Sequence, residues 1–150
     1  MTQLSNVFQF FTAAVAGHFV GALVLYLNHR FVFHGKLGGL PFLRNMRRLH
    51  TLHHRHTFDD KVNQFLKTPL WGKLSLSLVF IMSGFIISPA FGLGLFTFAL
   101  VYSRRHRMAH NGDVSRFALH HMGHHLKASV NFSGVYPLFD RLFFTHEDIK

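Results

Sequence analysis

The first 29 residues of the chain contain no lysine, arginine, aspartate or glutamate. Within them, residues 7–27 (VFQFFTAAVAGHFVGALVLYL) are interrupted by only three strongly polar side chains, Gln9, Thr12 and His18. An α-helix rises about 1.5 Å per residue, so this run is roughly 30 Å long and matches the hydrocarbon core of a bilayer. The pattern predicts one transmembrane helix near the N-terminus.

A second apolar block covers residues 70–102 and is too long for a single crossing. Ser88 and Pro89 lie near its middle. Because proline disfavours a helical conformation in the residue before it, we expect a break there. The two legs would be roughly 28 Å and 20 Å long at the helical rise. The block predicts a helical hairpin that enters the bilayer and returns; a buried hairpin in a soluble protein is the alternative.

The charged residues lie between and after these apolar blocks. Sixteen Lys and Arg against six Asp and Glu give a net charge of +10, and residues 74–103 carry no charge at all. One span followed by a hairpin places residues 30–73 and all residues from 104 onward on one side, together with all 16 basic residues. The positive-inside rule makes that side cytoplasmic. This distribution is typical of membrane-protein loops, so we expect no nucleic-acid partner.

Ten of the 14 histidines fall into four motifs near the cytoplasmic ends of the predicted spans. The motifs are H-x4-H (His29, His34), H-x2-H-H (His50, His53, His54), H-x3-H (His106, His110) and a second H-x2-H-H (His121, His124, His125). On an α-helix the H-x2-H-H side chains span about 100° and those of H-x3-H about 40°, so each motif can present several nitrogens to one centre. H-x4-H separates its members by about 140°, which suits two neighbouring metals better than one.

Ten imidazoles exceed what one ion can hold, so the motifs predict two metals. Imidazole suits zinc, copper, iron and nickel alike. The absence of cysteine excludes thiolate-ligated zinc and iron–sulfur clusters, and the single glutamate, Glu147, excludes a ferritin-like site. A bis-histidine haem using His18 would leave the motifs unexplained, and a zinc hydrolase normally holds each metal with few ligands.

These patterns together predict an all-α integral-membrane protein that forms one domain over residues 1–150. We expect one N-terminal span, a helical hairpin, and a cytoplasmic helical cap that holds a histidine-rich dimetal site. A bacterial inner membrane or the endoplasmic reticulum would be its location.

The order of the histidine motifs around two apolar legs resembles that of the fatty acid hydroxylase/sterol desaturase superfamily. HRFVFH, residues 29–34, is similar to the opening motif of its fatty acid 2-hydroxylase branch. NFSGVYPLFDRLFFTH, residues 131–146, resembles the closing segment, which is usually asparagine-aromatic-glycine followed by aspartate-x-leucine-phenylalanine-glycine-threonine. The resemblance covers residues 23–146, and the full set of motifs in this order is a specific signal.

The resemblance implies a di-iron oxygenase that hydroxylates or desaturates a C–H bond of a lipid, such as a fatty acyl chain or a sterol, with O₂ and two external electrons. It implies iron coordination by His29, His34, His50, His53, His54, His106, His110, His121, His124 and His125. No catalytic residue beyond these ligands is implied. Asp140 and Asn131 would orient ligand imidazoles; for Asp140, an ion pair with Arg141 or Arg116 is the alternative.

Four histidines match no ligand position of the superfamily, namely His18, His56, His120 and His146. The chain carries no flavin or nicotinamide fingerprint and no cysteine. Electrons are therefore expected from a separate acidic protein, such as a ferredoxin or a small haem protein, which would dock on the basic cytoplasmic face. The lipid substrate would arrive from the bilayer.

Two features depart from the superfamily pattern: one span precedes the first histidine motif where two are common, and FFT, residues 143–145, replaces phenylalanine-glycine-threonine. Carotenoid hydroxylases of the same superfamily are also short, but their last histidine segment lacks the DRLF ending seen here. A histidine-rich metal transporter is the alternative from another class. Transport needs a polar path through the bilayer, and the spans offer only His18 and some serines and threonines.

Overall fold

The computed structural model describes residues 3–57 and 70–148, with side chains described from residue 78 onward in the second part. Every regular element among these residues is helical, which confirms the all-α fold. In chain order the elements are α1 (Gln3–Leu27), the π-helix η1 (Asn28–Phe33), the 3-10 helix η2 (Lys36–Gly39), α2 (Arg44–Arg55), α4 (Leu70–Ile87), α5 (Pro89–His110), α6 (Arg116–Leu126) and α7 (Leu138–Leu142).

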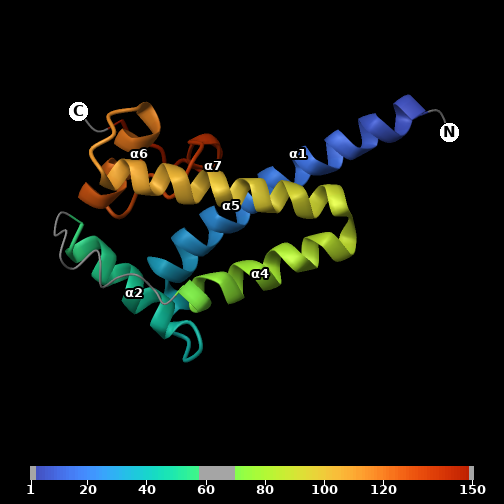
Figure 1. Cartoon of the computed structure of the whole chain (residues 1–150). Coiled ribbons are helices and arrows are strands. Elements are labelled where there is room, and N and C mark those ends of the chain that lie inside the picture. The colour runs from blue at the N-terminus through green and yellow to red at the C-terminus, as the bar shows by residue number, and fades with distance from the viewer. Residues whose placement is uncertain (1–2, 58–69, 149–150) are drawn as a thin grey trace.

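The three long helices form the body of the molecule. α1 crosses α5, and α4 packs beside α5, whereas α2, α6 and α7 gather at the end away from the N-terminus (Figure 1). The continuous helix Gln3–Phe33 is long and apolar enough to span a membrane, as predicted for the N-terminus. It is the only helix of that kind in the part of the chain that the structure describes. The crossing of the bilayer by α4 and α5 therefore remains a prediction.

The predicted break between the two legs of the hairpin is confirmed. α4 ends at Ile87 and α5 begins at Pro89, while Ser88 between them is extended, with φ −166° and ψ 137°. Proline at the first position of a helix costs no hydrogen bond, because that N–H has no partner within the helix. The second leg is longer than its apolar stretch, because α5 continues to His110 and so carries a histidine motif.

Small residues allow α1 and α5 to approach closely. A β-carbon at Gly94 of α5 would lie 2.0 Å from the carbonyl oxygen of Ala14, and one at Gly17 of α1 would lie 2.2 Å from that of Phe91. Gly21 lies one helical turn further along α1 and contacts the ring of Phe98. Small residues at such spacings are typical of helix interfaces within membranes, where close van der Waals packing replaces the hydrophobic effect.

Gly94→Ala is expected to lower the stability of the protein by about 1–3 kcal/mol, because the added methyl group can only be accommodated by moving α1 away from α5. Gly39→Ala is the matched control, since nothing lies within 4 Å of a β-carbon there. Thermal unfolding of both variants in the same detergent measures the difference. Equal melting temperatures would show that α1 and α5 do not pack through Gly94.

The segment that follows α6 returns along the long helices. Val135 packs in a buried cluster with Ala22 of α1 and Phe98 of α5. Gly134 lies so close to Leu25 and Tyr102 that a β-carbon would be 2.7 Å and 2.5 Å from them. This segment therefore lies alongside the apolar helices α1 and α5.

His18 connects this returning segment to both long helices. Its Nδ1 lies 3.1 Å from Thr97 Oγ1 on α5, and its Nε2 lies 3.2 Å from the Tyr136 hydroxyl. Thr97 donates its own proton to the carbonyl of Gly94. Its oxygen therefore accepts from His18 Nδ1–H, and His18 Nε2 accepts from Tyr136. His18 is thus fully hydrogen-bonded and serves packing, consistent with its lack of a motif partner.

Candidate metal centre

A single π-helical turn places the two histidines of the first motif. In η1, the backbone N–H of His34 donates to the carbonyl of His29, five residues earlier, at 3.1 Å. A wider turn brings residues five apart onto the same side, whereas an α-helix would separate them by about 140°. The expectation that His29 and His34 suit two different metals is therefore wrong. Both rings point to one centre.

The triad on α2 divides between two centres. His50 Nε2 lies 3.0 Å from His29 Nε2, 2.8 Å from His34 Nε2 and 3.0 Å from His54 Nε2. His53 points elsewhere, with its Nε2 3.2 Å from His106 Nε2. His50 and His54 are four residues apart and therefore lie on one face of the α-helix. His53 is displaced from that face around the helix axis.

The triad on α6 divides in the same way. His121 Nε2 lies 3.1 Å from both His110 Nε2 and His125 Nε2. His124 turns to the other centre, where its Nε2 lies 3.0 Å from His34 Nε2. The two triads are therefore used reciprocally: each gives its outer pair to one centre and its middle member to the other.

Two histidine groups result, and together with His125 they contain all ten predicted ligands. The first histidine group is His29, His34, His50, His54 and His124, and the second is His53, His106, His110 and His121. The ligand nitrogens within each group lie within 4.8 Å of one another. His125 adjoins the second group, with its ring centroid 4.6 Å from that of His53, and it also lies 4.4 Å from the ring of His54 in the first.

Backbone and side-chain acceptors fix which ring nitrogens face these centres. His29 Nδ1 donates to the carbonyl of Phe132 at 2.6 Å, and His124 Nδ1 donates to that of Val130 at 2.7 Å. Thr57 donates its hydroxyl proton to carbonyls of α2, so at 2.6 Å it accepts from His125 Nδ1. Each of these three rings therefore carries its proton on Nδ1 and directs the Nε2 lone pair inward.

Converging lone pairs repel one another unless a cation lies between them. Two nitrogens bound at right angles to one ion, each about 2.1 Å away, are about 3.0 Å apart. The neighbouring Nε2 atoms here are separated by 2.8–3.2 Å. The spacing and the fixed tautomers therefore fit two adjacent metal ions.

Burial holds several imidazoles of the two groups in the neutral form that binds metals. Burial, followed by the proximity of His124 and His54, lowers the pKa of His34 to about 3. Burial, with His124 and His110 nearby, lowers the pKa of His54 to about 4. The pKa values of His50 and His125 are lowered in the same way. No proton needs to be displaced from these rings at neutral pH when a metal binds.

Asp140 organises the segment that supplies the carbonyl acceptors. Its carboxylate is fully buried and accepts hydrogen bonds from the backbone N–H groups of Phe132 (2.8 Å) and Ser133 (2.9 Å), and from the Thr145 hydroxyl (2.8 Å). Burial alone would raise its pKa, but hydrogen bonds from His120, Ser133 and Thr145 lower it. Asp140 thus acts on the predicted ligand His29 through Phe132, not by direct contact.

The side chain that bonds the Asp140 carboxylate from α6 is neither Arg141 nor Arg116 but a histidine. Asp140 Oδ2 lies 3.0 Å from Nε2 of His120, which stacks on His146 with centroids 5.5 Å apart. Neither of these histidines belongs to the two groups, as expected. His56, also expected to be no ligand, caps the C-terminus of α2 through its backbone N–H.

Asn131 closes the same segment at its other end and touches no ligand. Its amide donates to the carbonyl of Glu147 at 2.8 Å and accepts from the Glu147 backbone N–H at 2.9 Å. Its own N–H donates to the carbonyl of Thr145 at 2.8 Å, and its φ of 58° is one that asparagine tolerates. Asn131 therefore positions the carbonyls of its neighbours Val130 and Phe132.

The FFT sequence retains the turn for which the superfamily commonly uses glycine. Phe144 has φ 57° and is 95% exposed, so its side chain gains little from packing while its backbone is strained. The backbone N–H of Thr145 still donates to the backbone carbonyl of Asp140, at 2.7 Å. The turn is therefore maintained by its hydrogen bonds despite the unfavourable residue.

Phe144→Gly is expected to stabilise the protein by about 1 kcal/mol and raise its melting temperature by about 2–4 °C. The adjacent Phe143→Gly is the control. It should lower the melting temperature, because Phe143 has a negative φ and its ring stacks on that of Tyr26 with centroids 5.3 Å apart. Thermal unfolding of both variants provides the measurement. A lower melting temperature for Phe144→Gly would mean that its side chain contributes to the fold.

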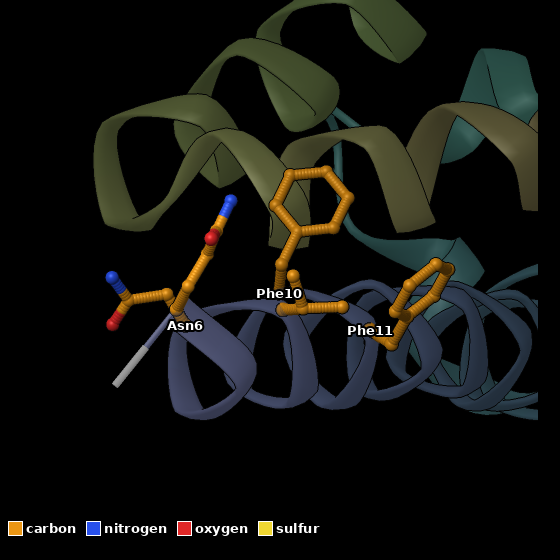
Figure 2. Close-up of a pocket in the computed structure, with 5 residues that line it drawn as sticks. Asn6, Phe10 and Phe11 are labelled. Atoms are coloured by element: carbon orange, nitrogen blue, oxygen red, sulfur yellow. The ribbon is translucent and has the colours of Figure 1, made fainter. Parts of the chain in front are cut away.

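The hollow shown in Figure 2 lies at the opposite end of the molecule. It has a volume of about 320 Å³ and is lined by Gln3, Asn6, Val7, Phe10 and Phe11 at the start of α1. None of these side chains is a histidine or a carboxylate, and the phenyl rings are exposed, as expected for a surface that faces lipid. The chemistry therefore belongs to the histidine groups and not to this hollow.

The fold and the site define an all-helical protein with one candidate membrane span and two histidine groups that could each hold a metal ion. The fatty acid hydroxylase family profile matches residues 14–145, and the chain belongs to the fatty acid hydroxylase family. Membership indicates an oxidoreductase acting on lipids, of the hydroxylase or desaturase type. Comparison with curated proteins and with solved structures gave no match.

Proposed function

We propose that the protein is a membrane-bound, non-haem di-iron oxygenase that acts on a fatty acyl chain or a sterol. It either inserts one atom of O₂ into a C–H bond of this lipid or desaturates the lipid. The observation that supports this most directly is the pair of adjacent histidine groups, which have neutral, converging imidazoles and contain no carboxylate. When bound there, two iron ions would supply the activation of O₂. Hydroxylation then consumes one O₂, two electrons and two protons, and yields the alcohol and one water.

The ligands of each iron follow from the two groups. His29, His34, His50, His54 and His124 would hold one ion, and His53, His106, His110, His121 and His125 the other. Because the ligands carry no charge, the ions would keep their full positive charge.

Aromatic rings line the first group and limit the access of water. Phe33 stacks on His50 with centroids 4.8 Å apart, and Phe132 lies edge-on to His29 at 5.8 Å. A dry, apolar wall protects a strong oxidant from side reactions and suits a hydrocarbon substrate. These rings favour a lipid chain as the group that is oxidised.

Metal content and product formation test the proposal together. The purified protein should contain close to two iron ions per chain, and cells that express it should accumulate an oxidised lipid only when O₂ is present. Exchangeable zinc without O₂-dependent product would favour the transporter instead. An oxidised carotenoid in place of an acyl or sterol product would identify the alternative within the superfamily.

We further propose that the histidine groups face the cytoplasm, where an acidic protein such as a ferredoxin or a small haem protein delivers electrons. The support is the net charge of +10 and its location outside the apolar segments. A reporter fused at the N-terminus should then lie outside the cytoplasm, and one at the C-terminus inside. Two cytoplasmic reporters would contradict this topology.

Turnover at limiting donor is expected to fall as salt rises from about 0.05 M to about 0.3 M, because attraction between surface charges is screened over roughly 8 Å at physiological salt. The control is the same titration at saturating donor, where docking no longer limits the rate. A flat response at limiting donor would exclude electrostatic docking on the basic face.

A further inference from the structure

Four arginines surround one hollow on the outer side of α2. Arg44, Arg48 and Arg55 lie within about 40° of one another around the helix axis, on the side opposite His53. Together with Arg47 and Thr51 they line a hollow of about 530 Å³, and Gly38 of η2 lines it from the other side. A β-carbon at Gly38 would lie 2.7 Å from Arg47 Cδ, so η2 packs directly on an arginine side chain.

No described carboxylate neutralises this charge. The acidic residues that the structure describes have other partners: Asp113 bonds Ser115, Asp140 bonds His120, Glu147 bonds Lys127 and Asp148 bonds His146. Four guanidinium groups around one hollow repel one another and therefore favour an anion between them. Arginine pairs geometrically with phosphate, because its planar group can donate two parallel hydrogen bonds.

The surroundings of the hollow indicate where such an anion would come from. Leu37, Leu40 and Phe42 precede α2 and are exposed, Phe42 at 76%. They follow directly after the apolar helix Gln3–Phe33, and a bilayer crossed by that helix would have its headgroups at this level. Exposed apolar side chains beside arginines are typical of a segment that lies in the membrane interface.

We propose that this arginine hollow binds the phosphate of an anionic lipid headgroup. Phe42 and its apolar neighbours would enter the acyl layer while Arg44, Arg47, Arg48 and Arg55 hold the phosphate. α2 also carries His50, His53 and His54, so a bound headgroup would fix the helix that supplies ligands to both histidine groups. The proposal concerns lipid binding alone and is independent of the reaction at the metal centre.

The test measures which lipids the full chain retains. The protein is reconstituted in phosphatidylcholine containing one part in five of phosphatidylglycerol, extracted gently, and examined by native mass spectrometry. We expect enrichment of phosphatidylglycerol, and a loss of about 25-fold in its binding in Arg44→Gln/Arg48→Gln, since each arginine near a membrane contributes about fivefold. Arg104→Gln/Arg141→Gln is the charge-matched control, at exposed arginines outside the hollow, and should keep the enrichment.

Several results would overturn the proposal. They are absence of enrichment in the wild-type protein, equal loss in the two double variants, and unchanged enrichment in Arg44→Gln/Arg48→Gln. Removal of the enrichment by excess inorganic phosphate would identify a site for the free anion. A higher KM for the electron donor without any lipid preference would identify a protein-docking site. Melting temperatures check that the variants fold. If the double variant unfolds, Arg44→Gln alone replaces it, with an expected loss of about fivefold in phosphatidylglycerol binding.

Discussion

His53→Ala and His124→Ala are each expected to lose bound iron and abolish lipid oxidation while the helical fold persists. His53 belongs to the second histidine group and His124 to the first, so each variant removes a ligand from a different ion. The loss of iron affinity should exceed the roughly 10- to 100-fold loss that follows removal of a group hydrogen-bonded to a metal ligand. Iron content, circular dichroism and product formation on the purified variants provide the measurement.

His18→Ala and His146→Ala are the matched controls, because both remove a histidine outside the two groups. His18 bonds Thr97 of α5 and Tyr136 of the returning segment, and an interhelical bond such as that to Thr97 is worth about 0.6 kcal/mol within membranes. Both controls should keep their iron and most of their activity. Full iron and activity in His53→Ala, or loss of iron in His18→Ala, would show that the metal centre involves other histidines.

Asp140→Asn is expected to destabilise the protein by about 3 kcal/mol and to weaken metal binding by about 10- to 100-fold. The buried carboxylate accepts four hydrogen bonds, and an amide of the same shape replaces one acceptor oxygen by a donor. The backbone at Phe132 would then shift, together with the carbonyl that orients His29. Thermal unfolding and metal titration measure the two effects separately.

Glu147→Gln is a suitable comparison, since it also neutralises an acidic side chain of the same segment. Its ion pair with Lys127 is partly exposed, so its loss should cost less than about 1 kcal/mol and leave metal binding unchanged. If Asp140→Asn binds iron like the wild-type protein, the returning segment does not need Asp140 to position His29.

Much of the local structure could be predicted from the order of residues alone. The apolar run at 7–27 predicted an N-terminal span, and the structure has a helix there that is long and apolar enough to cross a membrane. The Ser88-Pro89 pair predicted where the hairpin breaks, and that break is confirmed. These features depend on neighbouring residues only, through helical rise and the geometry of proline. The motif spacing likewise identified ten histidines, all of which the fold brings together.

Only the tertiary structure decided how these histidines are shared. The spacing predicts that His50 and His54 lie on one face of the helix and that His53 lies on another. It does not predict which distant helix each face contacts, because this depends on how α2 packs against η1, α5 and α6. The π-turn that brings His29 and His34 to one centre was likewise seen only in the structure, since their spacing predicted an α-helical separation. Asp140 contacts His120 and not an arginine, because the segment from Asn131 to Thr145 folds back along α1 and α5. Contacts between residues far apart in the chain follow from the packing of whole helices, which local spacing does not encode.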